Sequence, residues 1–280
     1  MCSANLPDPT ILLPNQYFNT LLWTGNDSSD RDITGVGFQP DWVWIKNRQG
    51  PDWNCLADTV RGINTFMFSN NTDADDTNNT NGHINSVLAD GFNVTAGDSG
   101  NVNENNEDYV SWNWNAGGST VTNNDGSISS QVRANASAGF SIIGYTGTGG
   151  AGTIGHGLGV APKVAIVRRR DNASDWAVYH GEIGNTKRLV LNSIAAESNA
   201  SASWWNNTSP TSTTISLGSD AGTGGTTDTY IVYAFSEVAG YSKFGSYTGN
   251  GNADGTFVFT GFRPAWVLIK TSSKTDSWLL

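Results

Sequence analysis

The sequence of 280 residues contains little charge and no long apolar run. Asp, Glu, Lys and Arg make up only 14% of it, and the net charge is −10. A protein that binds nucleic acid needs a basic stripe along its surface. The only basic run here, Arg168–Arg170, is followed at once by Asp171, so we expect no nucleic-acid partner. No apolar run approaches the ~20 residues that a membrane-spanning helix needs, so we also expect no membrane span.

Cysteine and histidine are equally scarce. The two cysteines, Cys2 and Cys55, could pair, but two free thiols in a reducing compartment are the simpler interpretation. The three histidines, His83, His156 and His180, are far from one another and from both cysteines along the chain. This spacing offers no zinc site.

What the sequence does contain is Gly, Thr, Asn and aromatic residues, arranged without the 3.6-residue apolar period of a helix. This composition is typical of short strands joined by polar turns. Alternation predicts strands near 18–23, 41–46, 64–69, 84–88, 91–95 and 108–114. The stretch Trp42–Ile45 is apolar on both faces, which predicts a central strand that is covered on both sides.

An internal repeat is the main signal. The segments GFQPDWVWIK (37–46), GVAPKVAIVR (159–168) and GFRPAWVLIK (261–270) each join a Gly–x–x–Pro turn to an alternating strand. A Thr-Gly pair begins thirteen residues before each of these glycines. The first two copies also agree further along the chain at offsets of 121 to 123 residues, with Asp52-Trp53 matching Asp175-Trp176. Repeats of ~100 residues indicate domains that each bury a core, rather than a solenoid.

The repeat predicts four segments. Residues 1–16, with three prolines, form an extended arm that is not helical. Residues 17–118 form a first β-sandwich, and 119–240 form a linker hairpin with a second one. Residues 241–280 begin an incomplete third repeat with a strand over 265–269. Such a fragment would expose Trp266 and Trp278, so we expect the natural chain to continue for at least ~60 residues.

Several stretches carry a family resemblance. They are YFNTLLWTGN, GFQPDWVWIKNR, DTVRG and YVSWNWNAGG in the first copy, the run from GFSIIGYTGTGG to DNASDWAVYH in the second, and the spacer NNDGSISSQVRANASAGFSI. Together they resemble a repeat domain of virion structural proteins from marine bacteriophages, of the cyanophage and pelagiphage type, over roughly residues 17–280. The resemblance implies tandem concanavalin-like jelly-roll sandwiches in tail fibres, spikes or other appendages. It brings no catalytic residues with it.

Acidic residues suggest two kinds of site. A glycan hydrolase needs two nearby carboxylates, and Glu104 and Asp108 would share a face only if a strand began as early as residue 104. The second copy has no such pair, so a polar loop is the favoured interpretation. The acidic stretches 73–76 and 98–108 offer oxygen ligands that suit Ca²⁺, but without EF-hand spacing. Solvated loops are favoured there, and no catalytic or metal-binding residue is predicted.

Aromatic residues suggest one binding site. Trp204 and Trp205 stand in a polar stretch, 198–210, where flat rings would suit sugar surfaces or a protein interface. Packing between domains or subunits is the favoured alternative. Trp53, Trp176 and Trp278 recur in register, which predicts a core position for each.

These observations predict an all-β phage virion protein without enzymatic activity. We expect an appendage, a tail fibre or spike, that serves assembly and host-surface attachment. The alternatives are a capsid decoration or head-fibre protein and a glycan-degrading depolymerase. The resemblance implies a homo-oligomer, often a trimer. We expect the extended arm to bind other virion proteins, because such a segment can order on a partner surface, and we expect a host surface glycan as a further partner. We expect no cofactor.

Overall fold

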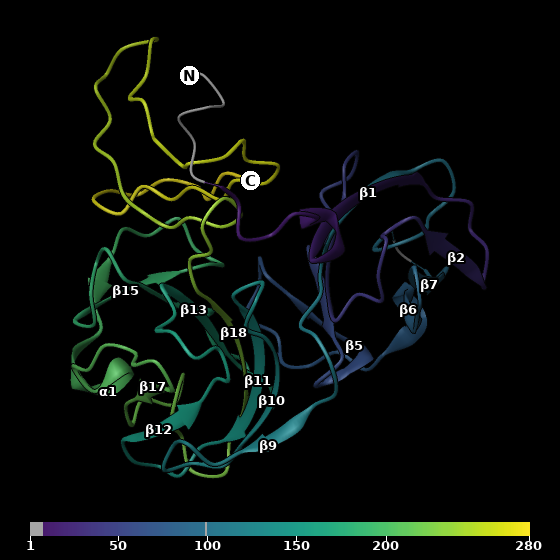
Figure 1. Cartoon of the computed structure of the whole chain (residues 1–280). Helices are drawn as coiled ribbons and strands as arrows, with labels where there is room; N and C mark the ends of the chain where they lie inside the picture. The colour runs from purple at the N-terminus through teal and green to yellow at the C-terminus, as the bar shows by residue number, and fades with distance from the viewer. Residues whose placement is uncertain (1–7, 99) are drawn as a thin grey trace.

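The computed structural model describes residues 8–98 and 100–280, and its fold is all-β with antiparallel sheets. The first unit contains a five-stranded sheet and a three-stranded sheet (Figure 1). The larger sheet has the strand order β1 (Phe18–Thr24), β8 (Asp108–Trp114), β3 (Trp42–Asn47), β4 (Cys55–Asp58) and β5 (Gly62–Phe68). The smaller sheet has the order β2 (Arg31–Thr34), β7 (Gly91–Thr95) and β6 (His83–Leu88), with a 3-10 turn, η3 (Asn79–Asn81), before β6.

The second unit contains an eight-stranded sheet and a two-stranded sheet. The larger sheet has the order β16 (Ser198–Asn199), β15 (Lys187–Val190), β14 (Ala177–His180), β13 (Val164–Arg169), β18 (Thr229–Phe235), β11 (Phe140–Thr146), β10 (Ser130–Asn135) and β9 (Val121–Asn123). The smaller sheet pairs β12 (Gly152–Gly155) with β17 (Thr214–Leu217), and one short helix, α1 (Ser201–Trp205), precedes β17. The strands β9 and β10 form a hairpin that extends the larger sheet.

The larger sheets of the two units share one strand order. The order β1-β8-β3-β4-β5 in the first matches β11-β18-β13-β14-β15 in the second. Their register also corresponds, because Ile45 pairs with Cys55 and Val167 pairs with Ala177, 122 residues later in each case. A side-chain contact also recurs, at a spacing of 121 residues, since the hydroxyls of Tyr109 and Tyr230 donate to Gly100 O and Ala221 O.

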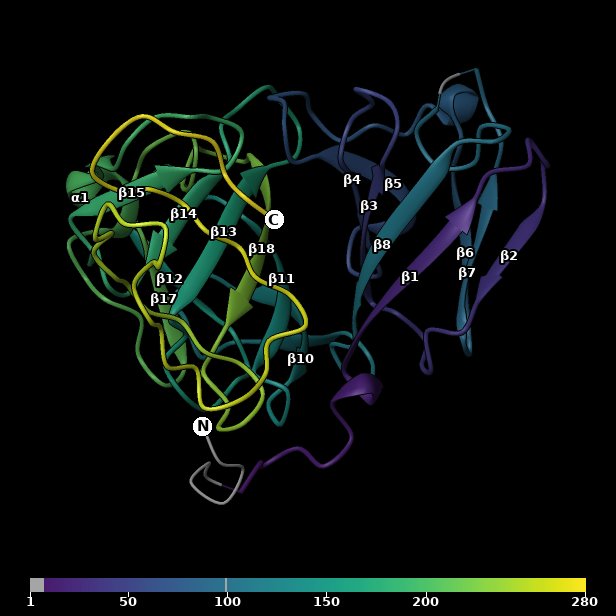
Figure 2. The ribbon, with the colours of Figure 1, turned by 90° about the horizontal axis from the view of Figure 1, so that it is seen from above.

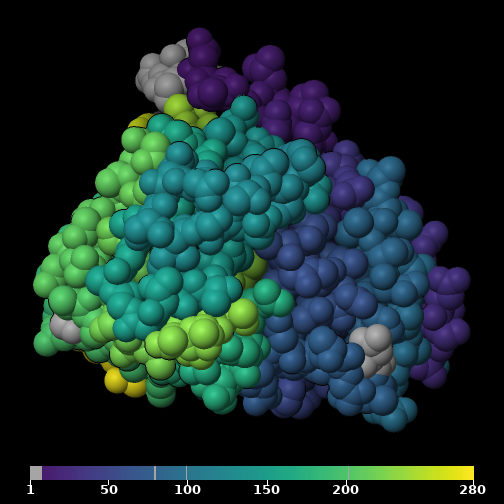
Figure 3. Space-filling model, turned by 90° about the horizontal axis from the view of Figure 1, so that it is seen from below, coloured from purple at the N-terminus to yellow at the C-terminus, as the bar shows by residue number. Residues whose placement is uncertain are grey.

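The four sheets lie in layers with an apolar core between each neighbouring pair. One core separates the two sheets of the first unit, and another separates the two sheets of the second. The third core lies between the five-stranded and the eight-stranded sheets, whose outer faces pack against each other (Figure 2). The space-filling view shows the two units meeting along a continuous seam (Figure 3).

The six strands predicted from alternation in the first unit all occur, with boundaries that shift by a few residues. The prediction for Trp42–Ile45 is confirmed, because all four residues are buried. Val43 and Ile45 face the core within the first unit, while Trp42 and Trp44 face the second unit. A strand covered on both faces reads as a continuous apolar run.

The N-terminal arm differs from its prediction where the structure describes it. Residues Pro14–Gln16 form a 3-10 turn, η2, which the sequence analysis excluded. Proline is tolerated in the first turn of a helix because its missing N–H would be unpaired there anyway. Ile11 is buried, and the Thr10 N–H donates to Ala239 O at 3.1 Å. Residues 9–11 of the arm therefore pack on the second unit, whereas Gln16 O accepts from Asn115 of the first. Residues 1–7 lie outside the described part.

The C-terminal segment also differs from its prediction. No strand forms over 265–269, and the only pairing there is an isolated bridge between Ile269 and Leu279. Trp266 and Trp278 are half-buried rather than exposed, because both pack at the edge of the core between the units. The segment lies across one side of the second unit (Figure 1), and Leu280 lines a hollow together with residues of both units.

Trp53 does not occupy the core position predicted for it. Its side chain is 44% exposed, whereas Trp176 is fully buried. The cross-strand pairs make Asn54, not Trp53, the equivalent of Trp176, since both residues immediately precede the equivalent residues Cys55 and Ala177. A shift of one residue in a strand moves a side chain to the other face, which explains the different environments.

Cys55 is a buried free thiol, and Cys2 lies outside the described residues. Within the described ranges, no helix is long and apolar enough to cross a membrane.

Candidate functional site

The apolar core between the two large sheets is the most extensive contact between the units. The ring of Trp42 stacks on Tyr233 with centroids 4.2 Å apart and lies 4.3 Å from the ring of Trp114. Phe140 completes this aromatic cluster, 5.6 Å from Trp42. Large aromatic rings bury much apolar area, and such ring pairs contribute further through their geometry. The interface therefore has the character of a protein interior.

A buried ion pair lies at one side of this core. Arg61 and Asp58 have fully buried side chains, and Arg61 Nε lies 2.5 Å from Asp58 Oδ2. Tyr233, from the second unit, donates its hydroxyl to the same carboxylate oxygen at 2.8 Å. Burial by itself would lower the pKa of Arg61, but Asp58, Tyr233 and Asp75 together outweigh it and the pKa is raised. Burial raises the pKa of Tyr233 well above its ordinary value, so its hydroxyl keeps the proton that it donates.

An acidic loop of the first unit meets the basic run of the second. Asp75 accepts from Arg61 at 3.0 Å and from Arg170 at 2.8 Å, so it links the two units. The guanidinium of Arg168 donates to the backbone oxygens of Asp73 and Ser174. Sequence reasoning assigned these acids to a solvated loop and missed this contact. The sequence shows both components, an acidic stretch and the only basic run, but nothing in it shows that they meet.

The backbone and one tryptophan complete this contact. The amide of Asp75 donates to Arg170 O at 2.7 Å, and the amide of Ser174 donates to Thr72 O at 3.0 Å. The indole N–H of Trp176 donates to Phe68 O in the first unit at 2.9 Å. Burial lowers the pKa of Arg168, which lies over the Trp176 ring, to about 10. Arg168 therefore stays charged at neutral pH.

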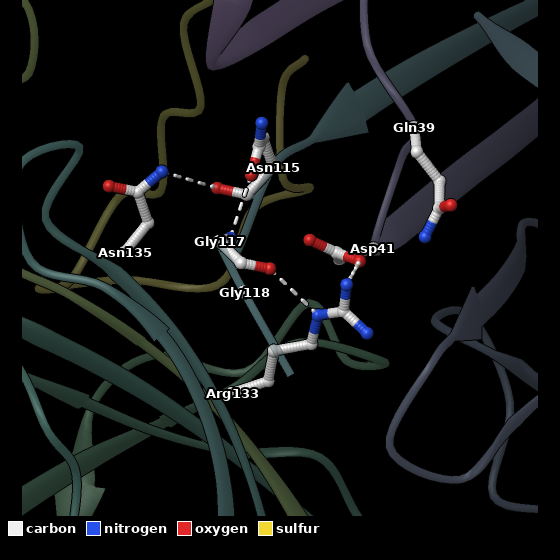
Figure 4. A pocket seen from close by; sticks show the side chains of 7 residues that line it. All are labelled: Gln39, Asp41, Asn115, Gly117, Gly118, Arg133 and Asn135. Atoms are coloured by element: carbon white, nitrogen blue, oxygen red, sulfur yellow. Dashed lines mark hydrogen bonds and ion pairs between the residues drawn. The ribbon is translucent and has the colours of Figure 1, made fainter. Parts of the chain in front are cut away.

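A polar hollow of about 460 Å³ marks a second place where the units meet (Figure 4). Asp41, in the turn before β3, accepts from Arg133 of β10 at 2.8 Å and from the amide of Ala116 at 2.8 Å. Arg133 also donates to Gly117 O at 3.0 Å. Burial raises the pKa of Asp41 to about 6, although Arg133 opposes the shift. This arrangement ties the first unit to the hairpin of the second.

One family matches the chain. The family model described as "Domain of unknown function (DUF7483)" covers residues 13–280. The chain belongs to this family. No curated protein and no solved structure matches it. The DUF7483 description states no activity, so function has to be argued from the geometry above.

The predicted binding pair of this DUF7483 chain lies in the interior of the second unit. Trp204 and Trp205, in α1, are 9% and 1% exposed and belong to the core between the sheets of that unit. The indole N–H of Trp205 donates to Lys187 O, and Arg188 lies 3.6 Å from the centroid of the Trp204 ring. Their burial supports packing, within the unit rather than between units. Ligand binding by the pair stays a prediction.

The acidic residues of the DUF7483 chain do not form the dyad considered from sequence. Strand β8 begins at Asp108, so Glu104 lies outside the strand and the condition for a shared face is not met. Asp108 accepts from the hydroxyl of Thr24 at 2.7 Å. Among residues 8–98 and 100–280, no group of three or more His, Cys, Asp or Glu residues is arranged to hold a metal ion. Calcium binding stays a prediction.

Proposed function

We propose that the protein is a structural component of a bacteriophage virion, an appendage of the tail-fibre or spike type. One observation carries the proposal: the two units share an apolar core, beside which Tyr233 of the second unit donates to the buried Arg61–Asp58 pair of the first. Interfaces between domains that move relative to each other are usually smaller and more polar. A rigid, repeated β-structure suits a part that transmits position and load rather than one that opens around a substrate. The resemblance of the repeats to virion proteins supplies the context.

We propose a finer fold on the same basis. Residues 17–118 and 119–240 are two copies of one jelly-roll sandwich, with residues 1–16 as the arm and 241–280 as the beginning of a third copy. The shared strand order supports this division, as do the equivalent cross-strand pairs. A jelly roll requires a particular set of crossings between sheets, which an experimental map would trace.

The proposal assigns the remaining surfaces to partners. Loops at the ends of the sandwiches face a host surface glycan, and the arm binds other virion proteins as part of a homo-oligomer. The net charge of −10 keeps such a protein soluble and away from nucleic acid before assembly. The proposal includes no catalytic step and no cofactor, and it places the protein in the virion.

Mass spectrometry of purified phage particles tests the assignment first. We expect peptides of this chain to copurify with the particle through a density gradient. Their absence from infectious particles would overturn the proposal. A cryo-EM map of the same particles then distinguishes an appendage from a capsid decoration protein. Density at a tail or vertex hub supports a fibre, whereas many copies at capsid lattice sites would establish the decoration protein in its place.

A further inference from the structure

The contact that joins the two units recurs on the second unit. Trp176 donates its indole N–H to Phe68 O, and Trp278 donates its indole N–H to Val190 O, both at 2.9 Å. The two acceptors are equivalent, because Phe68 pairs with Cys55 and Val190 pairs with Ala177 in the corresponding strands. The C-terminal segment therefore approaches the second unit as the second unit approaches the first.

Two backbone hydrogen bonds recur with the tryptophan. The bond from the Ser174 amide to Thr72 O has a counterpart from the Asp276 amide to Ile194 O at 2.8 Å. The bond from the Asp75 amide to Arg170 O has a counterpart from the Glu197 amide to Ser272 O at 2.7 Å. On the acidic-loop side, the residue in each counterpart bond lies 122 positions later in the chain (72 to 194, 75 to 197). On the partner side, it lies 102 positions later (174 to 276, 170 to 272). Because both hydrogen bonds recur with the same two spacings, they belong to one contact that is repeated.

The fold of the C-terminal segment agrees with this correspondence. Ile269 and Leu279 exchange two backbone hydrogen bonds of 2.9 Å as an isolated antiparallel bridge. The same 102-residue shift aligns this bridge with the pair Val167–Ala177 that opens the β13–β14 hairpin. Lys270 stands where the second unit has Arg168, and its ammonium group donates to Ile194 O at 3.3 Å. Segment 261–280 thus has the register of a third β3–β4 hairpin.

The segment also reaches the first unit, which a linear row of units would not allow. The ring of Trp266 lies 5.5 Å from that of Trp114 and 6.3 Å from that of Phe18. Leu268, Trp278 and Leu280 line a hollow of about 250 Å³ together with residues of both units, which include Trp44, Asn54 and Leu191.

We propose that the open seam between the five-stranded and eight-stranded sheets is a docking surface for a third sheet of the same kind, built from residues 261–280 onward as its first hairpin. The three sheets then surround one apolar core by the same head-to-tail contact, related by a pseudo-threefold axis. Heterologous contacts of this kind form a closed ring when the rotation between units closes. The contacts of Trp266 and Trp278 with two different units provide that closure.

Engineered disulfides in the full chain test the repeated contact. The variant Ile194→Cys/Asp276→Cys joins the second unit to the C-terminal segment, and Thr72→Cys/Ser174→Cys is its matched counterpart between the first two units. Thr122→Cys/Asp276→Cys is the mispaired control, because Thr122 lies in β9 at the opposite edge of the eight-stranded sheet. A Cys2→Ser background removes a competing thiol, and Cys55 is buried.

We expect both matched pairs to form disulfides under mild oxidation, at yields at least about ten-fold above the control. Formation of the Thr72–Ser174 pair without the Ile194–Asp276 pair would overturn the proposal. If neither forms, hydrogen exchange of the unmodified chain decides. The amides of Glu197, Ile269, Asp276 and Leu279 should exchange at least about ten-fold more slowly than those of the exposed stretch 250–256. Equal exchange in the two sets would refute the docking.

Discussion

At the residue scale, a few buried polar groups hold the two units together. Asp58, Arg61 and Tyr233 form a fully buried cluster in which each charge or hydroxyl has a partner. Removing one member of a buried ion pair is costly, because the remaining charge loses its compensation while it stays away from water. The cluster therefore specifies how the units meet more than it adds to net stability.

Replacing Arg61 by Met should lower the free energy of unfolding by about 3–5 kcal/mol, because Asp58 would remain buried without its cation. The double variant Arg61→Met/Asp58→Asn should recover part of this loss, since an amide carries no charge. Arg48→Met, at an exposed position, is the control and should change the value by less than about 0.5 kcal/mol. Urea denaturation measures all three. A double variant that is less stable than Arg61→Met would contradict the interpretation.

The raised pKa of Asp41 predicts that the free energy of unfolding depends on pH. Burial raises its pKa from 3.8 to about 6 in the folded protein. Between these values the folded protein holds a proton that the unfolded chain has released, so the free energy of unfolding falls as the pH rises. This contribution is fully present below pH 3.8 and is lost by about pH 6, on the order of 3 kcal/mol.

Urea denaturation at pH 4, 5, 6 and 7 measures the effect against Asp41→Asn, which has no carboxyl to titrate. The difference between the two proteins should change across pH 4–6 and level off above it. Asp254→Asn, in an exposed stretch, is the control and should follow the unsubstituted protein. A constant difference between Asp41→Asn and the unsubstituted protein over the whole range would refute the shift.

At the element scale, strand register decides what each tryptophan does. Trp176 precedes β14 directly and faces the core between the units, whereas Trp53 lies one residue further from β4. The ring of Trp53 packs edge-on against Phe68 of its own unit, with centroids 4.5 Å apart. Two residues that match in a sequence motif therefore have different structural roles.

This difference predicts unequal effects of alanine at the two positions. Trp176→Ala should destabilise the protein by about 3–5 kcal/mol, because it opens a cavity in the shared core and removes the hydrogen bond to Phe68 O. Trp53→Ala should cost less than about 1.5 kcal/mol, since much of its ring is already in water. Thermal unfolding of both variants provides the comparison. Equal losses would mean that the register assignment is wrong.

Much of the fold could be predicted from the sequence, because strands with one or two apolar faces have a visible period. The two-sided burial of Trp42–Ile45 is one example. The register slip at Trp53 could not be predicted, since the motif matches at 123 residues while the strand pairing repeats at 122 (Cys55 to Ala177). Packing of Trp204 and Trp205 was the favoured alternative, but its place inside the second unit could not be predicted, because the polar stretch gives no sign of the short helix that carries them.

The charged residues of the site between the units could be recognised in the sequence, but their contact could not be predicted. The acidic loop at 73–76 and the basic run at 168–170 were both evident, but they are nearly 100 residues apart. Their contact depends on how the two large sheets face each other, which no local pattern records. The sequence does not indicate that Asp58 and Arg61 form a buried pair, because exposed ion pairs in turns are also commonly three residues apart.

At the scale of the whole molecule, the shared core should make the two units one cooperative body. Trp42 and Trp114 of the first unit pack against Tyr233 of the second, so neither unit keeps the shared core covered when the other unfolds. Independent sandwiches joined by a linker would instead unfold separately.

Hydrogen exchange of the full chain in increasing urea tests this central claim most directly. It compares the amides of β3, in the first unit, with those of β13, in the second. The account predicts that both strands lose protection in one transition at the same urea concentration, with the same free energy of opening. Loss of protection in one strand while the other stays protected over a separate range of urea would contradict it.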